Sequence, residues 1–404
     1  MKSVGNWERL GMKSEWTLKK LSEIADFNPR ESLRKGTVAK KVGMDKLQPF
    51  CRDIPFYELE AYTGGTKFRN GDTIMARITP CLENGKTAKV NILEEGEIGF
   101  GSTEYIVFRA KEGVDEDFLY YLVCSSIIRE PAIKSMVGSS GRQRVQTDVV
   151  ENLDIAVPSY EEQHLIGRIL RNLDDKIKIN NKINENLEQQ AQAYFDKLFV
   201  ANADPNWPEC TLSDVGSIVA GGTPSKSKVE YYTDHGIAWI TPKDLSVDKS
   251  KFISHGENDI SELGLTKSSA TKMPVGTVLF SSRAPIGYIA IAQNEVTTNQ
   301  GFKSVIPNEN IGTAYVYFLL KNLLPTIEGM ASGSTFKEIS GAGMKSVPTV
   351  MPDTDTIQLF RSFCEPLFKE QEVLEAENKH LSALRDSLLP KLMSGEIDVS
   401  ELDL

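Results

Sequence analysis

Mostly apolar residues between positions 159 and 200 recur at spacings that alternate between four and three. The repeating positions are Ile166, Leu170, Leu173, Ile177, Asn180, Asn184, Leu187, Ala191, Tyr194 and Leu198. Such spacings place the side chains along one stripe of a helix and are typical of a coiled-coil seam. We therefore predict a long helix over this segment, with its stripe packed against another helix.

A second stripe follows roughly 194 residues after the first, which indicates an internal repeat. Its positions are Phe360, Cys364, Leu367, Gln371, Leu374, Asn378, Leu381, Arg385, Leu388 and Leu392. Most of these residues are apolar. Each stripe also follows a proline and a glutamine, Pro158 with Gln163 and Pro352 with Gln358. The chain is therefore duplicated, and each copy ends in a long helix.

Asparagine occupies the same place in both stripes, as Asn184 and Asn378. An asparagine in a seam lowers stability but can fix the register and the partner of a helix. Two interpretations stay open. Both residues face solvent where the stripe drifts around the helix, or both fix an antiparallel pairing of the two helices.

The duplication divides the chain into four segments. They are residues 1–158, 159–200, 201–352 and 353–404, the last including the C-terminal tail. We call residues 1–158 head 1 and residues 201–352 head 2. The segment 200–208, with two prolines, links the first long helix to head 2.

Both heads show alternation of apolar and polar residues followed by a helical pattern. Expected strands are 72–78, 87–90 and 104–108 in head 1, and 276–283 with 287–292 in head 2. Expected helices are 117–128 and 314–324, and short helices are expected to start at Ser22 and Ser213. These patterns predict α+β heads.

Composition sets limits on partners and location. The formal net charge is −10, but most of the excess acid lies in residues 353–404, so either head can still carry a basic face. The five cysteines are scattered without a C-x-x-C pair, which fits free thiols in a reducing compartment. The start is polar, and no apolar run approaches the ~20 residues of a membrane span. We expect a cytoplasmic protein.

Catalytic and cofactor motifs are missing from the sequence. Residues 84–87, Asn-Gly-Lys-Thr, suggest a phosphate loop, but Pro80 stands where that motif needs glycine. Asn28-Pro29-Arg30 lacks the second proline and aromatic residue of an amino-methylating site. The four histidines show no metal-ligand spacing. We expect a chain without catalytic activity, cofactor or metal.

Several runs resemble the target recognition domains of type I restriction–modification specificity subunits. They are residues 71–86 and 101–105 in head 1, and Gly221-Gly222-Thr223-Pro224-Ser225, Tyr231-Tyr232, Trp239-Ile240 and Lys243-Asp244-Leu245 in head 2. The helix starts at Pro158/Gln163 and Pro352/Gln358 are similar to the two conserved spacer regions of that family. The resemblance covers essentially the whole chain, in the family's domain order.

The resemblance implies two tandem α/β target recognition domains, each followed by a long helix, with the two helices paired as an antiparallel coiled coil. Each head would bind one half of a split double-stranded DNA sequence, and the unlike heads imply an asymmetric target. Two methyltransferase subunits would dock on the helices and heads, and restriction and translocase subunits would join them. S-adenosylmethionine and ATP with Mg²⁺ would belong to these partners.

Candidate DNA-contacting residues are polar or basic side chains in loops of the heads, because such side chains can bond base edges or phosphates. In head 1 they are Arg77, Thr79, Lys86, Arg142, Gln143 and Arg144. In head 2 they are Lys226, Lys243, Ser282, Arg283, Asn299, Gln300 and Lys337. The turn 221–225 is either a simple loop or a backbone that approaches DNA phosphates.

Two alternatives remain open from the sequence. The chain could be a coiled-coil adaptor that binds only protein, or the recognition fragment of a fused restriction or methylation enzyme. The basic, glycine-containing loops at matching places in both heads favour DNA over the adaptor. The missing catalytic motifs count against the enzyme.

Overall fold

The computed structural model describes residues 16–139, 141–333 and 337–400. The chain forms two compact units, one of residues 1–178 with 379–404 and one of residues 179–378. We call them unit 1 and unit 2. Each contains one head and parts of both long helices, because the division falls inside both helices.

Head 1 contains two four-stranded sheets. Its strands are β2 (Ala25–Phe27), β3 (Val38–Val42), β4 (Glu58–Ala61), β5 (Thr66–Phe68), β6 (Thr73–Ala76), β7 (Thr87–Lys89), β8 (Gly99–Gly101) and β9 (Tyr105–Ala110). One sheet has the order β2-β9-β6-β7, and the other β4-β3-β8-β5. A short ribbon of β1 (Thr17–Lys20) and β10 (Asp154–Val157) joins the beginning of head 1 to its end.

Head 1 also contains four short α-helices. They are α2 (Leu21–Ile24), α3 (Glu116–Cys124), α4 (Ser126–Lys134) and α5 (Thr147–Glu151), with a 3₁₀ turn at Met44–Lys46. Asp115 caps α3, accepting hydrogen bonds from the backbone N–H groups of Asp117 and Phe118. The helix expected over 117–128 is divided at Ser125, whose hydroxyl donates to the Leu122 carbonyl.

Head 2 repeats this plan with changes at the edges. Its strands are β12 (Gly216–Ala220), β13 (Tyr232–Thr233), β14 (Ile237–Ile240), β15 (Phe252–Ile253), β16 (Asn258–Ile260), β17 (Val278–Ser282), β18 (Ile286–Ala292), β19 (Thr297–Thr298) and β20 (Lys303–Pro307). The sheet orders are β12-β20-β17-β18-β15 and β13-β16-β14-β19. The hairpin expected over 276–292 is confirmed as the antiparallel pair β17 and β18.

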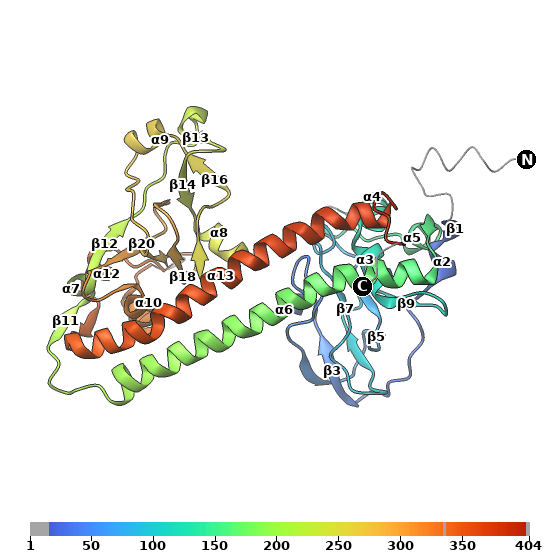
Figure 1. The fold of residues 1–404 in the computed structure, drawn as a ribbon, viewed down its shortest axis with the longest axis horizontal. Helices are drawn as coiled ribbons and strands as arrows, with labels where there is room; N and C mark the ends of the chain where they lie inside the picture. Colours follow the sequence, from blue (N-terminus) through green and yellow to red (C-terminus); the bar gives the residue numbers. More distant parts are fainter. Residues whose placement is uncertain (1–15, 140, 334–336, 401–404) are drawn as a thin grey trace, which may run out of the picture. The chain divides into compact units, whose positions relative to one another are not determined.

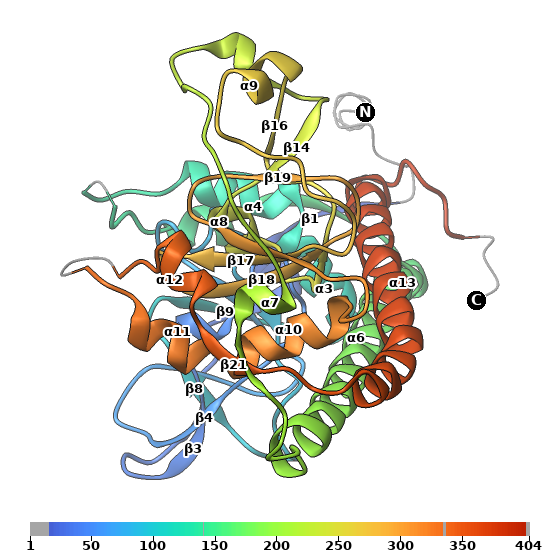
Figure 2. The same ribbon diagram turned by 90° about the vertical axis from the view of Figure 1, so that its left-hand side faces the viewer.

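The remaining elements of head 2 include counterparts of the four helices of head 1, together with two further short helices between residues 242 and 266. They are α7 (Leu212–Val215), α8 (Pro242–Val247), α9 (Glu262–Thr266), α10 (Thr313–Asn322), α11 (Leu324–Met330), α12 (Gly341–Lys345), a 3₁₀ turn at Val229–Tyr231, and the ribbon of β11 (Glu209–Thr211) with β21 (Pro348–Val350). Helix α10 packs against β17, β18 and β20 (Figure 2). The duplication inferred from the sequence is thus a duplication of topology.

The two predicted long helices are present as α6 (Tyr160–Asp196) and α13 (Thr354–Met393). Lys197–Ala201 continues α6 as a π-helical turn. In each unit the two helices run side by side in opposite directions (Figure 1). In unit 2, Tyr194 near the end of α6 lies against Phe360 and Phe363 near the start of α13. In unit 1, Asp174 pairs with Arg385.

The predicted stripes are the packed faces of both helices. The core of unit 1 takes Ile166 and Leu170 from α6 and Leu392 from α13. The core of unit 2 takes Ala191 from α6 and Phe360 with other residues from α13. Each head therefore packs on both long helices. The large buried side chains of α3 belong to the same core as the stripe residues in unit 1, and those of α10 do so in unit 2. Among the described residues, no helix is both long enough and apolar enough to cross a membrane.

Candidate DNA interface

Five of the six candidates in head 1 are brought together where two distant loops pair. The segment after β6 lies antiparallel to the segment before α5, so that Ile78 is paired with Arg144 and Arg144 with Val137. The Thr79 N–H donates to the Gln143 carbonyl at 3.0 Å. We call this arrangement, with Arg77, Thr79, Arg142, Gln143 and Arg144, the head 1 patch.

The basic side chains of the head 1 patch differ in how free they are. Arg142 is exposed. Arg77 is half-buried, and its Nη2 donates to the Val145 carbonyl at 3.3 Å. Arg144 keeps 46% of its side chain exposed but binds Glu104, with Nη2 2.7 Å from Oε1. The hydrogen bond from Arg144 lowers the pKa of Glu104, so this carboxylate stays charged and holds the guanidinium.

Lys86 lies at the end of the turn between β6 and β7 rather than in the paired loops. Its ammonium donates to the Met44 carbonyl at 2.8 Å. Arg129 of α4 holds the same turn, donating to the Glu83 carbonyl at 2.6 Å and stacking over Phe50 at 5.2 Å. Head 2 has only a short connection between β17 and β18, so this turn is a feature of head 1.

Head 2 contains the same three-segment pairing. Arg283, directly after β17, is paired with Glu338, and Glu338 with Ser332. The Arg283 guanidinium lies 3.4 Å from a Glu338 carboxylate oxygen. Next to it, Asn299 accepts a hydrogen bond from the Gly301 N–H at 2.8 Å. We call Arg283, Asn299, Gln300, Lys337 and Glu338 the head 2 patch.

Two other candidates of head 2 have different surroundings. Ser282 is completely buried, and its hydroxyl donates to the Gly301 carbonyl at 3.1 Å, so in this conformation it supports Arg283 and does not face a ligand. Lys243 is exposed at the start of α8 and pairs with Glu257 at 2.6 Å.

The glycine turn before Lys226 packs against the head 2 patch. The Gly222 N–H donates to the Thr298 carbonyl, and the Trp239 indole N–H donates to the Gly222 carbonyl. A Cβ at Gly221 would lie 1.9 Å from the Asn299 carbonyl oxygen, so only glycine fits there. Lys226 itself is exposed beyond this turn.

Sequence reasoning missed Glu104 and Lys303, which share these patches with the candidates. Lys303 is buried in β20, with its ammonium 3.4 Å from the Ser282 hydroxyl and 3.7 Å from Glu338. Burial lowers the pKa of Lys303, against the opposite effect of Glu338. The available signal for Lys303 was a lysine at the start of the mostly apolar stretch 303–307; Glu104 offered none.

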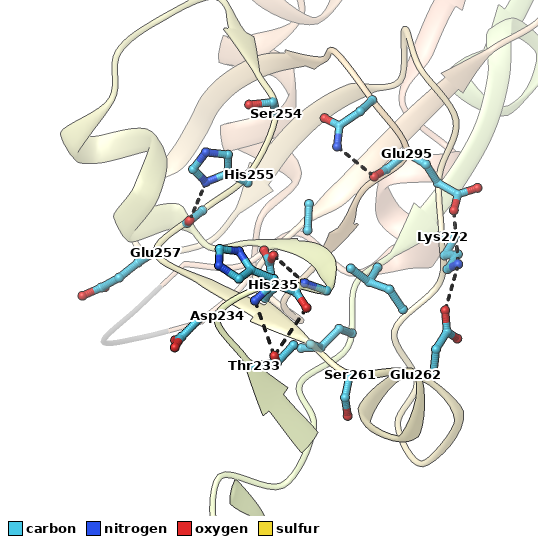
Figure 3. A pocket seen from close by; sticks show the side chains of 17 residues that line it. Thr233, Asp234, His235, Ser254, His255, Glu257, Ser261, Glu262, Lys272 and Glu295 are labelled. Atoms are coloured by element: carbon cyan, nitrogen blue, oxygen red, sulfur yellow. Dashed lines mark hydrogen bonds and ion pairs between the residues drawn. The ribbon is translucent and has the colours of Figure 1, made fainter. Parts of the chain in front are cut away.

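A separate pocket of head 2 lies among β13, β14 and β16 (Figure 3). Its lining includes Asp234, Glu257 and Asp259, and its Lys272 is paired with Glu262 and Glu295. Such a lining repels phosphate, so this pocket is not a candidate for contact with the DNA backbone. Among the described residues, no group of three acidic, histidine or cysteine side chains could hold a metal ion.

Comparisons with known proteins agree with this duplicated plan. The family model described as the type I restriction modification DNA specificity domain matches twice, over residues 13–189 and 205–381. The HindI specificity subunit of Haemophilus influenzae is 25% identical over 407 residues, covering 81% of this chain and 87% of that protein. The MjaIX specificity subunit of Methanocaldococcus jannaschii is 35% identical over 190 residues, which span 45% of this chain and 44% of that protein.

A solved structure supports the fold. The type I restriction-modification system S subunit from M. genitalium superposes with a TM-score of 0.58 at 17% identity, covering 95% of this chain and 98% of that one. The family assignment favours a DNA-specificity protein over both the protein-only adaptor and the enzyme fragment. Specificity subunits are non-catalytic, and S-adenosylmethionine and ATP belong to the methyltransferase and restriction subunits of the complex. The chain belongs to the family of type I restriction–modification specificity subunits, whose two target recognition domains determine the DNA target of the complex.

Proposed function

We propose that head 1 and head 2 each bind one half of a bipartite double-stranded DNA site and that the two half-sites differ in sequence. The observation that carries this proposal is the shared three-segment pairing. Ile78, Arg144 and Val137 in head 1 correspond to Arg283, Glu338 and Ser332 in head 2. The backbone plan is the same, but the side chains that it presents are different, which favours an asymmetric target.

The candidate residues divide between the two half-sites. The first is assigned to Arg77, Thr79, Lys86, Arg142, Gln143 and Arg144. The second is assigned to Lys226, Lys243, Arg283, Asn299, Gln300 and Lys337, with Ser282 as their support. Arginine can bond two acceptors of guanine, and asparagine or glutamine can do the same for adenine, so both patches hold groups suited to base edges.

The long helices would act as spacers between the heads, with recognition domains at residues 1–158 and 201–352 and spacer regions at 159–200 and 353–404. Helix α6 has 37 residues and α13 has 40. At about 1.5 Å per residue these lengths correspond to roughly 55–60 Å. That exceeds the ~34–36 Å between successive major-groove faces of DNA. Asn184 and Asn378 would help to fix the register of the pair.

Within the complex, two methyltransferase subunits would dock on the helices and heads, and restriction and translocase subunits would bind to that assembly. The methyltransferase subunits would supply S-adenosylmethionine, and the restriction subunits ATP with Mg²⁺. A complex that acts on cellular DNA would work in the cytoplasm, with no membrane partner.

The experiment uses the chain together with its methyltransferase subunits. Methylome sequencing of cells that carry both gives the target, and fluorescence anisotropy then measures affinity for that duplex and for versions with one half scrambled. Arg142→Ala with Arg144→Ala should weaken binding and lower the log–log salt slope by up to about 0.9 per lost phosphate contact. Arg69→Ala, which removes an exposed arginine of head 1 paired with Glu31, is the matched control. An unchanged affinity and slope in the folded double variant would contradict the assignment.

A further inference from the structure

A buried lysine joins head 2 to both long helices. Lys251, directly before β15, keeps only 6% of its side chain exposed. Its ammonium lies 2.6 Å from a carboxylate oxygen of Glu188 on α6 and 2.8 Å from the side-chain oxygen of Gln371 on α13. One side chain of the head thus makes a charged contact with one helix and a hydrogen bond with the other.

Aromatic rings surround the same ammonium. Its distance to the ring centre is 3.5 Å for Phe368 of α13, and 4.6 and 5.3 Å for Tyr317 and Phe318 of α10. A cation over aromatic faces is attracted electrostatically, most strongly when water is excluded. These three rings form an aromatic cage that restricts the ammonium to one position.

The groups around Lys251 are themselves fixed. Glu188 also binds Lys321 at 2.6 Å and accepts a hydrogen bond from the Tyr317 hydroxyl at 3.2 Å. Glu375 of α13 accepts hydrogen bonds from the backbone N–H groups of Lys251 and Phe252 at 2.8 and 3.1 Å. The network therefore connects α6, α13, α10 and the beginning of β15.

Unit 1 joins its head to the helices with a partly different set of groups. Asp174 of α6 pairs with Arg385 of α13 at 2.7 Å and accepts a hydrogen bond from the Tyr121 hydroxyl of the head. The buried Arg52 of the head also pairs with Asp175 of α6. Both heads thus supply a buried cation to a carboxylate of α6, and in unit 2 the same ammonium also donates to a side chain of α13.

Stability alone does not explain a buried lysine. Replacing buried ion pairs by apolar residues of similar size is often neutral or stabilising, because removing charges from water is costly. Burial lowers the pKa of Lys251 to about 8, which shows that its charged form is held at a cost despite Glu188. A directional contact of this kind is instead suited to fixing one orientation of the parts that it joins.

We propose that Lys251 is a positioning residue that fixes the orientation of head 2 on α6 and α13 and thereby restricts the spacer length that the protein accepts between half-sites. This inference rests on the proposed function. Head 2 would recognise its bases through its own patch, and Lys251 would decide where that patch is presented.

The test compares Lys251→Met with wild type, each purified with its methyltransferase subunits. Methionine keeps the apolar stem in the cage and leaves Glu188 paired with Lys321. Affinity is measured on duplexes that keep both half-sites and change the spacer one base pair at a time. We expect a sharp optimum for wild type and, for the variant, a loss of about tenfold at that optimum with nearly equal affinities at neighbouring spacers. The base preference of each half-site should not change.

Lys249→Met is the matched control, because Lys249 is exposed two residues away. If Lys251→Met does not fold, Glu188→Gln, which preserves shape, should broaden the same spacer profile. An unchanged profile in a folded Lys251→Met or Glu188→Gln protein would overturn the inference and leave the two-head proposal intact. A wild-type protein that recognises no bipartite duplex would overturn the proposed function itself.

Discussion

Arg144 and Glu104 of head 1 face each other in a two-pronged ion pair, with Nη2 2.7 Å from Oε1 and Nε 3.0 Å from both carboxylate oxygens. The pair occupies the guanidinium that we assign to DNA. Binding of Arg144 to a phosphate or base would therefore compete with Glu104, and we expect the pair to restrain binding to the wrong sequence.

Glu104→Gln should release Arg144 and raise affinity for DNA that lacks the target. Because Arg144 then becomes available to a phosphate, the log–log salt slope should increase by up to about 0.9. Titration of a non-target duplex at several salt concentrations measures both quantities. Glu95→Gln removes the same charge from an exposed position of head 1. Equal effects of the two variants would mean that only net charge matters.

The sequence predicted the long helices well because their stripes are local patterns. It also gave Arg142, Gln143 and Arg144 as candidates, but it could not predict that Gln143 pairs with Thr79. That pairing joins segments far apart in the chain and depends on how β6 and β9 assemble. The sequence also could not show that Ser282, a polar residue at the end of a strand, is completely buried.

Polar positions in the stripes could be located from the sequence but not matched to partners. Asn378 was aligned with Asn184 by the repeat, yet its hydrogen bonds are with Asn180 and Asn181. In an antiparallel pair, residue numbers rise along one helix while they fall along the other. Asn184 and Asn378, which are equivalent in the repeat, are therefore not opposite each other. Gln371, the stripe residue opposite Asn184, donates to the Asn184 carbonyl at 3.1 Å.

The Asn180–Asn378 contact predicts a paired mutational effect. Asn180 is completely buried, and its amide donates to the Asn378 side chain at 2.9 Å and to Glu377 at 2.8 Å. Asn378→Leu should lower the free energy of unfolding by about 1–3 kcal/mol, because Asn180 loses a buried partner. Adding Asn180→Leu should restore most of that loss. Denaturant unfolding of Asn378→Leu, Asn180→Leu and the double variant checks this, and a double variant as unstable as the sum of the two single losses would contradict it.

Lengthening both helices together should lengthen the preferred DNA spacer. One heptad inserted after Ile183 and another after Ala376 would separate the Asn180–Asn378 and Asn184–Gln371 contacts without breaking either. Each insertion adds about 10 Å of helix. Methylome sequencing should show unchanged half-sites with a longer spacer. An unchanged spacer would mean that the methyltransferase subunits, not these helices, set the separation.

Lys251 predicts a pH dependence with a defined sign. Its pKa is about 8 in the folded protein, below the usual 10.5 of lysine, because burial disfavours the ammonium. Between about pH 8 and 10.5 the unfolded chain holds this proton more tightly, so the contribution of Lys251 to the free energy of unfolding should rise with pH. Wild type should therefore gain stability relative to Lys251→Met between pH 7.5 and about 9.5 in denaturant unfolding. A constant difference would show that the pKa of Lys251 is not lowered.

The central claim is that each head determines one half of the target, and exchanging head 1 tests it most directly. Residues 1–155 are replaced by the head of another specificity subunit, keeping apolar residues where the core of unit 1 meets Leu392 and Met393 of α13. The methylome of cells with this hybrid and the original methyltransferase is then sequenced. The account predicts that one half of the methylated sequence changes while the other half and the spacer stay the same. A change in both halves, or in neither, would contradict it.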